Sequence, residues 1–578
     1  MQVRAFKLSG SLLLAATVPG GVCSIPSCAP LPSSDCSVLH ECPIADGADD
    51  GSGQDGATGQ DVEIEGVGAD AGIDQGIGEA STAAAQPDAP AKESSVCDGT
   101  KLPHDDPCVI DEQFGVFVSP AGADSNPGTR ARPIYTLGQA IDMAHASGKQ
   151  RVYACAGTFA EQLNIGASRD GVAVYGGLDC TSWNYGSQNL VKVAPTQPGY
   201  VLDVEGLVEG ATFEDLAFVA PSASGATAGE SSIAVFVSGS QNITFHRVSI
   251  SAGNAADGAR GASGGPTIDG GAATAGTNWL DSPPYSELNG NDAIGALGAP
   301  QKACTCPDGT ASVGGNGGGS SDAGAQVPGE GLPAYDSDGG AGLVGRNGVS
   351  CGVGGVPMQN GADAPNTMNG PPTQSLGSVV TIGWAAAASV PGVNGMPGQG
   401  GGGGGNGLGG IGGGGSGACG GCGGAGGKPG GAGGSSVALL SFESTIELVG
   451  CSLTARSAGS GGAGGAGEPG QPGSRVAGNG GQGGCQGAAG GNGAGGNGGQ
   501  GGVGGISIGI GYTGTPPSFD GTPVATAASL AGVTLGAAGS GGRKGGAGAA
   551  ALTSVGQPQP GADGAPGFAG VAQAVLGF

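Results

Sequence analysis

The sequence predicts an all-β solenoid, a fold in which short strands stack turn upon turn. The main observation is a ten-residue phrase with apolar side chains at its first, third, sixth and eighth positions and alanine at its tenth. Its four copies begin at Ala211, Ile243, Ile446 and Ala528. Two alternating apolar pairs with one extra residue between them indicate two short strands that meet at a corner and both face inward. Recurrence of such a unit indicates a core completed by stacking on neighbouring units.

Composition limits the other fold classes. The chain has 578 residues, of which 134 are glycine, and aromatic residues make up only 4%. That is too little bulky apolar material for several ordinary globular cores. The net charge is −27, so no nucleic-acid partner is expected, because phosphate binding needs clustered lysine and arginine. Only four histidines are present, and we expect neither a cofactor nor a metal site.

The N-terminus has the pattern of an export signal. In residues 1–22, Arg4 and Lys7 precede a short apolar stretch, Leu8–Val18, that is too short to span a bilayer. Cys23 stands where a bacterial lipoprotein would be acylated, but the preceding Gly-Gly-Val departs from the usual motif. The sequence therefore predicts a protein that is secreted or held at the outer cell surface, with a lipid anchor and free secretion both open.

Residues 23–96 form a cysteine-containing segment and an acidic Gly/Ala/Asp linker without apolar periodicity, which we expect to be a solvated tether. Residues 97–199 are expected to hold an N-terminal cap and the first solenoid turns. Residues 136–146 have helical spacing, with Leu137, Ile141 and Ala144 on one side. Such a helix would cover the open end of the solenoid, where strand edges would otherwise be exposed.

Residues 114–183 resemble the N-terminal portion of bacterial secreted right-handed parallel β-helix proteins of the pectin-lyase-like class. The stretches that carry the resemblance are Phe117–Ile141, Val152–Glu161 and Gly171–Cys180, together with Trp183. The resemblance implies a right-handed parallel β-helix that begins with a strand, a Gly/Pro turn and a short capping helix, and it also implies export. It implies little about activity, because this fold carries many functions.

From residue 200 onward, solenoid turns are predicted to alternate with glycine-rich insertions of the collagen-like kind. The predicted turns are residues 200–252, 435–455 and 505–537, with a terminal strand at 569–578. The predicted insertions are residues 253–434, 456–504 and 538–568. Each insertion follows the last alanine of the phrase, so all should leave the solenoid at one corner.

Glycine occupies every third position from Gly392 to Gly413 and from Gly478 to Gly505. A three-residue period fits a polyproline-II helix. A collagen triple helix is not expected, because the second run contains no proline and the phase slips between runs. Two interpretations remain. The insertions are either extended helices that exchange backbone hydrogen bonds or mobile loops, since glycine loses the most entropy on ordering.

Fifteen cysteines in an exported chain predict disulfides. Cys97 and Cys108 bracket a short loop, and Cys155 and Cys180 fall in neighbouring strand-like segments. The remaining candidates lie in the insertions: Cys304, Cys306, Cys351, Cys419, Cys422 and Cys485. Zinc binding is the less favoured alternative for them, because a closing ligand pair is missing. Cys451 occupies an inward position of the phrase and is expected to be a buried thiol or a disulfide partner.

The corner of the phrase holds the few candidates for catalysis. Glu214 and Asp215 occupy it in the first copy, and His246 and Arg247 in the second, so stacking would form a small polar patch. The patch ends there, and the motifs of polygalacturonases are absent. The sequence therefore favours a non-enzymatic structural or adhesive protein that displays glycine-rich loops. It leaves the partner open, with extracellular polysaccharide or matrix as a candidate. The alternative is a carbohydrate-binding or polysaccharide-cleaving β-helix protein.

Overall fold

The computed structural model describes residues 97–264, 297–321, 324–335, 359–406, 413–481, 484–553 and 556–578, all within one compact unit. The predicted signal peptide, Cys23, the linker and Cys351 lie outside the described residues. Among the helices of the described part, none is long and apolar enough to cross a membrane.

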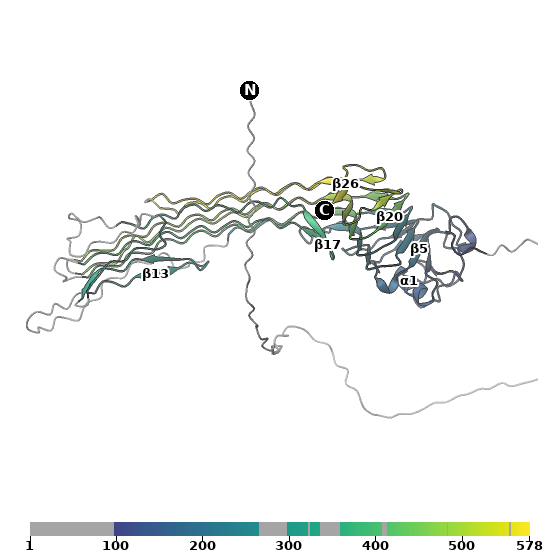
Figure 1. Ribbon diagram of the computed structural model, residues 1–578, viewed down its shortest axis with the longest axis horizontal. Helices are drawn as coiled ribbons and strands as arrows, with labels where there is room; N and C mark the ends of the chain where they lie inside the picture. The colour runs from purple at the N-terminus through teal and green to yellow at the C-terminus, as the bar shows by residue number, and fades with distance from the viewer. Residues whose placement is uncertain are drawn as a thin grey trace, which may run out of the picture. The chain divides into compact units, whose positions relative to one another are not determined.

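Three sheets built almost entirely of parallel strands form the framework (Figure 1). The first contains β1 (Gly115–Val118), β2 (Arg151–Cys155), β5 (Val172–Leu178), β8 (Ala211–Glu214), β11 (Ile243–His246), β20 (Ile446–Val449), β23 (Ser518–Phe519) and β24 (Thr522–Pro523). The second contains β3 (Gly157–Phe159), β6 (Val191–Val193), β9 (Leu216–Val219), β12 (Ser249–Ser251), β21 (Ser452–Thr454) and β25 (Val533–Thr534). The third contains β4 (Leu163–Ile165), β7 (Leu202–Glu205), β10 (Ser232–Ser238), β19 (Ser436–Phe442), β22 (Ser507–Thr513) and β26 (Ala572–Gly577).

The chain visits the three sheets in turn, and each passage adds a strand to each sheet. The passage β2, β3, β4 is followed by β5, β6, β7, and this order continues to β26. Every long glycine-rich segment lies in a connection from the second sheet to the third, namely β12 to β19, β21 to β22 and β25 to β26. For the described residues, the prediction of an all-β fold is confirmed, and the strands form parallel sheets.

Three of the four phrase copies stack in register. Ile243 pairs with Ala211 on one side and with Ile446 on the other, and Ile250 lies between Phe218 and Leu453 in the same way. The corner residue has a positive φ in each copy: 56° at Asp215, 52° at Arg247 and 62° at Gly450. The extra residue of the phrase therefore turns the chain from the first sheet to the second.

The fourth copy was predicted wrongly. Ser518 and Phe519, rather than Ala528 and Leu530, continue the first sheet by pairing with Glu447 and Leu448. Val533 pairs with Leu453, two residues away from the register that the spacing implies. The antiparallel pair β23–β24 ends the first sheet here. Because no further strand of that sheet follows, no neighbour enforces the register of the phrase.

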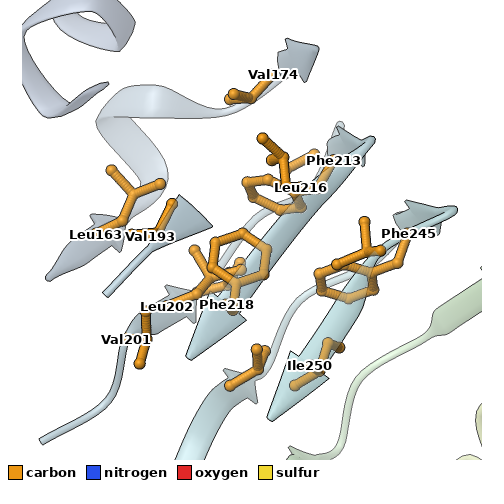
Figure 2. Close-up of a cluster of buried hydrophobic side chains, with 14 of the residues drawn as sticks. Leu163, Val174, Val193, Val201, Leu202, Phe213, Leu216, Phe218, Phe245 and Ile250 are labelled. Carbon is orange, nitrogen blue, oxygen red and sulfur yellow. The ribbon is translucent and has the colours of Figure 1, made fainter. Parts of the chain in front are cut away.

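Inward side chains of the three sheets form one continuous core (Figure 2). Phe213 and Phe245 stack at 5.4 Å between ring centroids, and Phe218 meets Phe213 edge-on at 5.8 Å. All three rings are fully buried. Like residues therefore stack on like residues of the next passage, and this burial is the main stabilising contribution of the framework.

Helix α1 (Leu137–Ala146) covers the first passage with its buried side chains Leu137, Ala140, Ile141 and Ala144. The Glu161 carboxylate accepts hydrogen bonds from the N–H groups of Leu137 and Gly138, at 2.7 and 3.1 Å. These are donors that a helix N-terminus leaves without an internal partner. The short 3₁₀ helices are η1 (Pro107–Val109) and η2 (Ala167–Arg169).

Three antiparallel hairpins lie within the β12–β19 connection. They are β13 (Lys302–Thr305) with β14 (Ala311–Gly314), β15 (Gly319–Ser321) with β16 (Gly324–Gln326), and β17 (Gly377–Val380) with β18 (Gly383–Ala386). The last hairpin packs on the outer face of the third sheet, where Val379 joins a buried cluster with Phe236 and Leu440.

Candidate functional site

The predicted polar patch forms around Glu214, at the end of β8. Its carboxylate is 1% exposed, and Oε1 accepts hydrogen bonds from the Arg247 guanidinium and lies 2.7 Å from Nδ1 of His104. The other oxygen, Oε2, is buried without a partner among the described residues. Glu214 is thus held by two neighbours in a covered position rather than presented to solvent.

Arg247 joins the patch to the corner of the phrase. It donates from Nε and Nη2 to the two carboxylate oxygens of Asp215, each at 2.9 Å. Hydrogen bonding to Asp215 and the charges of Asp215 and Glu214 raise the pKa of the Arg247 guanidinium above its usual range. This bidentate pair connects one passage to the next.

The segment before β1 covers the patch, a feature that the sequence did not indicate. His104 lies between Glu214 and Asp105, whose Oδ1 is 2.9 Å from Nε2 of His104, and Tyr185 lies 6.1 Å away, ring centroid to ring centroid. His246 is paired with Glu214 in the strand register, yet no ion pair or side-chain hydrogen bond found in the described residues involves its ring. Three of the four predicted residues therefore come together, as an ion-pair network that connects passages.

The second candidate is the set of glycine-rich segments, which we call the glycine bundle. It comprises residues 253–264, 359–364, 390–405, 413–434, 457–478, 484–505, 537–549 and 559–570, drawn in Figure 1 as long undulating rows. Residues 484–505 are its central segment, and every residue from 491 to 505 is buried. Of the two interpretations left open by the sequence, the ordered one holds for the described residues.

The central segment is hydrogen-bonded to neighbours on all sides. Three consecutive N–H groups point to three different segments: Ala494 donates to Met396, Gly495 to Gln559 and Gly496 to Glu468, at 3.0, 2.9 and 2.9 Å. Its carbonyl groups accept from two more segments, as in Gly424 to Ala494 and Gly548 to Gly496. These bonds recur every third residue, which is the period of a polyproline-II helix. A helix without internal hydrogen bonds thereby satisfies its backbone through its neighbours.

Close packing explains why glycine recurs. A Cβ at Gly496 would collide with the carbonyl oxygen of Ala425, and one at Gly495 with that of Gly548. At Gly546, on the exposed side of residues 537–549, a Cβ would meet nothing within 4 Å. Glycine is therefore required where one segment faces another and is dispensable where a segment faces solvent.

A few polar side chains of the central segment add hydrogen bonds to the backbone N–H groups of neighbouring segments. Gln500 Oε1 accepts from the N–H groups of Thr373 and Val390, at 3.1 and 3.0 Å, and Asn497 Oδ1 accepts from Ala562 at 2.7 Å. Both side chains are buried. They occupy positions in the triplet run that the sequence pattern alone did not distinguish.

The expectation of disulfide bonds is confirmed. Cys97 is bonded to Cys108 and Cys155 to Cys180, the pairings that the sequence favours. Cys304 is bonded to Cys419 and Cys306 to Cys422, so both disulfides join the β13–β14 hairpin to the glycine bundle. Cys485 is also disulfide-bonded. The Cys451 thiol is free and buried, and burial raises its pKa. In the described part, no group of histidine, cysteine and acidic residues could hold a metal ion.

Comparison with known proteins gives no match, whether to a protein-family model, to a curated protein or to a solved structure.

Proposed function

We propose that the chain is a non-enzymatic structural or adhesive protein, secreted or held at the outer cell surface, in which a β-helix carries a rigid bundle of glycine helices. The observation that carries this proposal is the hydrogen bonding of the central segment to its neighbours on all sides. A segment whose backbone is bonded in three directions per turn resists bending more than a lone polyproline-II helix does. Rigidity over a long element suits a load-bearing or display role.

The strand order supports the β-helix part of the proposal. Three sheets that the chain visits in the same order at every passage are what a parallel β-helix of the pectin-lyase-like class requires. Coiling in the right-handed sense is the expectation for parallel crossovers within one sheet. Helix α1 lies over the first passage, as the resemblance at residues 114–183 implies.

Four disulfides within the described residues support export, because such bonds persist in oxidising compartments. Polysaccharide cleavage receives less support. A general acid must reach the substrate, whereas the Glu214 carboxylate is 1% exposed and covered by His104.

A glycine substitution with a matched control tests the structural role. Gly496→Ala places a methyl group against the Ala425 carbonyl, whereas Gly546→Ala adds the same group where nothing lies within 4 Å. The full chain would be expressed with an epitope tag at its C-terminus, followed by cell fractionation, limited proteolysis and bead-adhesion measurements on extracellular matrix.

We expect the wild type and Gly546→Ala to reach the medium or the cell surface, to resist protease in the bundle and to bind matrix. Gly496→Ala should lose both protease resistance and adhesion, because overpacking against fixed backbone costs about 1–3 kcal/mol or more. A chain retained in the cytoplasm would overturn the proposal, as would equal adhesion of all three proteins. Release of reducing sugars from polysaccharide by the purified chain would overturn its non-enzymatic part.

A further inference from the structure

Asn–Gly pairs recur in the glycine-rich segments, and each pair carries its own chemical reactivity. Seven pairs have both residues described, and their asparagines are Asn316, Asn360, Asn369, Asn394, Asn479, Asn492 and Asn497. In such a pair the backbone nitrogen of the glycine can attack the side-chain carbonyl carbon of the asparagine. Glycine allows this ring closure best, because it has no Cβ to hinder it and its backbone turns freely. Each pair is therefore a candidate modification site.

The reaction consumes water and needs no enzyme. The glycine nitrogen bonds to the carbonyl carbon and gives up its proton, and the amide nitrogen of the asparagine takes a proton and leaves as ammonia. Water then opens the resulting succinimide ring at either carbonyl, which gives aspartate or isoaspartate. The sum is asparagine plus water to the acid plus ammonia. A neutral amide thus becomes a carboxylate, and isoaspartate also lengthens the backbone by one methylene group.

Most of these glycines donate their N–H to a neighbouring segment, which holds the nitrogen away from its own asparagine. The donors are Gly317, Gly361, Gly395, Gly493 and Gly498, and the respective acceptors are the carbonyl groups of Ala299, Ala489, Gly424, Gln471 and Ala562, at 2.8–2.9 Å. Attack requires the nitrogen and the carbonyl carbon to approach to about 3–3.5 Å. These pairs must therefore open locally before they can react.

Gly370 and Gly480 differ from the other five glycines. Neither of their N–H groups has an acceptor among the described residues. Exposure alone does not set them apart, because Asn360 and Asn394 are exposed like Asn479, yet the glycines that follow those two are hydrogen-bonded. The free nitrogen is thus the feature that distinguishes the two pairs, and it is the atom that must attack.

The side chain of Asn369 braces three segments of the glycine bundle. Its Oδ1 accepts from the Val393 N–H at 3.1 Å, and its Nδ2 donates to the carbonyl oxygens of Gly498 and Asp563, at 3.1 and 3.3 Å. The Val393 N–H also lies where negative charge develops on Oδ1 during attack, and a donor there stabilises that charge. After conversion, carboxylate oxygens would face two carbonyl oxygens without a proton to share, so the brace would be lost.

We propose that Asn369 and Asn479 are sites of spontaneous deamidation in the folded chain, and that conversion of Asn369 loosens the segment it braces. Hydrogen bonds of the glycine bundle protect the other five pairs. The proposal goes beyond the structural role above, because it concerns the chemistry of the chain wherever the chain is located. A chain that fails the export or adhesion tests can still deamidate at these two sites, so the two proposals fail separately.

Incubation of the purified, oxidised full chain in water enriched in heavy oxygen tests the proposal. Peptide mapping by mass spectrometry, with fragmentation that separates isoaspartate from aspartate, follows all seven pairs over time. We expect Asn369 and Asn479 to be converted at least about fivefold faster than any other pair, since breaking one hydrogen bond first slows a reaction by about that factor. Heavy oxygen in the new carboxylate shows that the conversion took place during the incubation.

Two controls show whether the fold sets these rates. In urea all seven pairs should react at similar rates, because they share the same two residues and no neighbouring segment then holds the glycine. Gly370→Ala adds a methyl group where nothing lies within 4 Å, so the fold should be kept. This variant should slow the conversion of Asn369, because the Cβ hinders ring closure, and should leave the rate at Asn479 unchanged.

A pair of aspartate variants tests the loss of the brace. Asn369→Asp reproduces one product of the reaction, and Asn366→Asp adds the same charge at an exposed residue whose side chain forms none of the hydrogen bonds found in the described part. Limited proteolysis should cleave residues 365–376 in the Asn369→Asp chain and leave them intact in the Asn366→Asp chain. Residues 491–505 should stay protected in both.

The proposal is overturned if any of the five hydrogen-bonded pairs is converted as fast as Asn369 or Asn479 in the folded chain. The same differences between pairs in urea would also overturn it, because the protection would then not come from the fold. Equal cleavage of the two aspartate variants would overturn the part that concerns the brace.

Discussion

Arg247 is the residue on which the ion-pair network at the corner of the phrase depends. It contacts Glu214, which is 1% exposed, and Asp215, which is 12% exposed. Removing one partner of a buried ion pair leaves an uncompensated charge, which costs about 3–5 kcal/mol. Because Arg247 is itself 37% exposed, water will compensate part of that loss, and we expect about 2 kcal/mol.

The substitution of choice is Arg247→Gly, because φ is +52° at this position and glycine adopts that conformation without strain. The free energy of unfolding, measured in urea, should fall by the stated amount. Arg456→Ala is the control, since Arg456 is exposed and forms none of the salt bridges found within the described residues. Equal stability of both variants would mean that the network contributes nothing.

Tyr153 gives the protein a specific sensitivity to alkaline pH. Its ring is fully buried, and burial raises the pKa of its hydroxyl from 10.0 to about 12. As pH rises above 10, the unfolded chain releases this proton while the folded chain retains it. Stability should therefore fall between pH 10 and about 12, by on the order of 2 kcal/mol.

Urea unfolding at a series of pH values from about 9 to about 12 measures this loss. Tyr153→Phe lowers stability at neutral pH by about 1 kcal/mol, because the hydroxyl donates to the Val109 carbonyl. The same variant should show a shallower decline at high pH. Burial also raises the pKa of Tyr335 to about 12, so part of the decline should remain. Identical slopes in the two proteins would contradict the assignment to Tyr153.

At the scale of single residues, the sequence predicted which side chains of the repeat lie next to one another, but it did not predict which residues cover them. Glu214, Asp215 and Arg247 do meet, because identical spacing in consecutive copies places them one strand apart. The covering residue His104 precedes Glu214 by 110 positions and belongs to no repeat. Its contact arises from the packing of the N-terminal segment on the first sheet, which a local pattern does not encode.

Two disulfides attach the β13–β14 hairpin to the glycine bundle. Cys304 and Cys306 join it to Cys419 and Cys422, across 115 and 116 residues of sequence. Closing one loop of this length stabilises by about 4–5 kcal/mol in the chain-entropy description, and the second disulfide adds much less because it closes nearly the same loop. Reduction should therefore release the hairpin before it affects residues 491–505 of the central segment, which contain no cysteine and are held by backbone hydrogen bonds.

Limited proteolysis with and without reductant, mapped by mass spectrometry, tests this order of release. We expect new cleavage sites within residues 297–335 on reduction and continued protection of residues 491–505. The double variant Cys306→Ser/Cys422→Ser should show part of the effect without reductant. Cleavage that begins in the central segment would show instead that the disulfides stabilise the whole bundle.

At the scale of elements, stacking decides which predictions succeed. The second phrase copy lies between the first and the third, which share its spacing, and the three registers agree. The fourth lies at the last passage, where Phe519 takes the place expected of Leu530. A periodic pattern predicts a strand only where the adjacent strand favours the same register.

Order in the glycine bundle is a property of the whole chain. Ala255 donates to Ser457 and Gly415 to Cys485, so each segment depends on residues far along the sequence. Glycine at every third position predicts the period of one helix, but it does not identify the segments that lie beside that helix. This is why the sequence left ordered and mobile insertions equally open, and why the hydrogen bonds between segments were needed to decide.

Chain truncation tests this dependence on distant residues. A chain that ends at residue 455 keeps the sheets up to β21 but lacks the central segment and residues 457–478. Residues 413–434 then lose the acceptors of Gly421, Gly424 and Gly427, which are Gly491, Ala494 and Asn497. Glycine-rich chain without such partners has too little burial to offset the entropy of ordering. We therefore expect residues 390–405 and 413–434 to become cleavable by protease in the truncated chain and to stay protected in the full one.

Residues 97–252 provide the internal control for this experiment. Their strands pair with one another and enclose the stacked Phe213, Phe218 and Phe245, so they should stay protected in both chains. Loss of protection there as well would mean that the parallel sheets need the glycine bundle in order to fold. Protection of residues 390–405 and 413–434 in the truncated chain would contradict the central role of residues 484–505, because the antiparallel pairing of these two segments would then be sufficient.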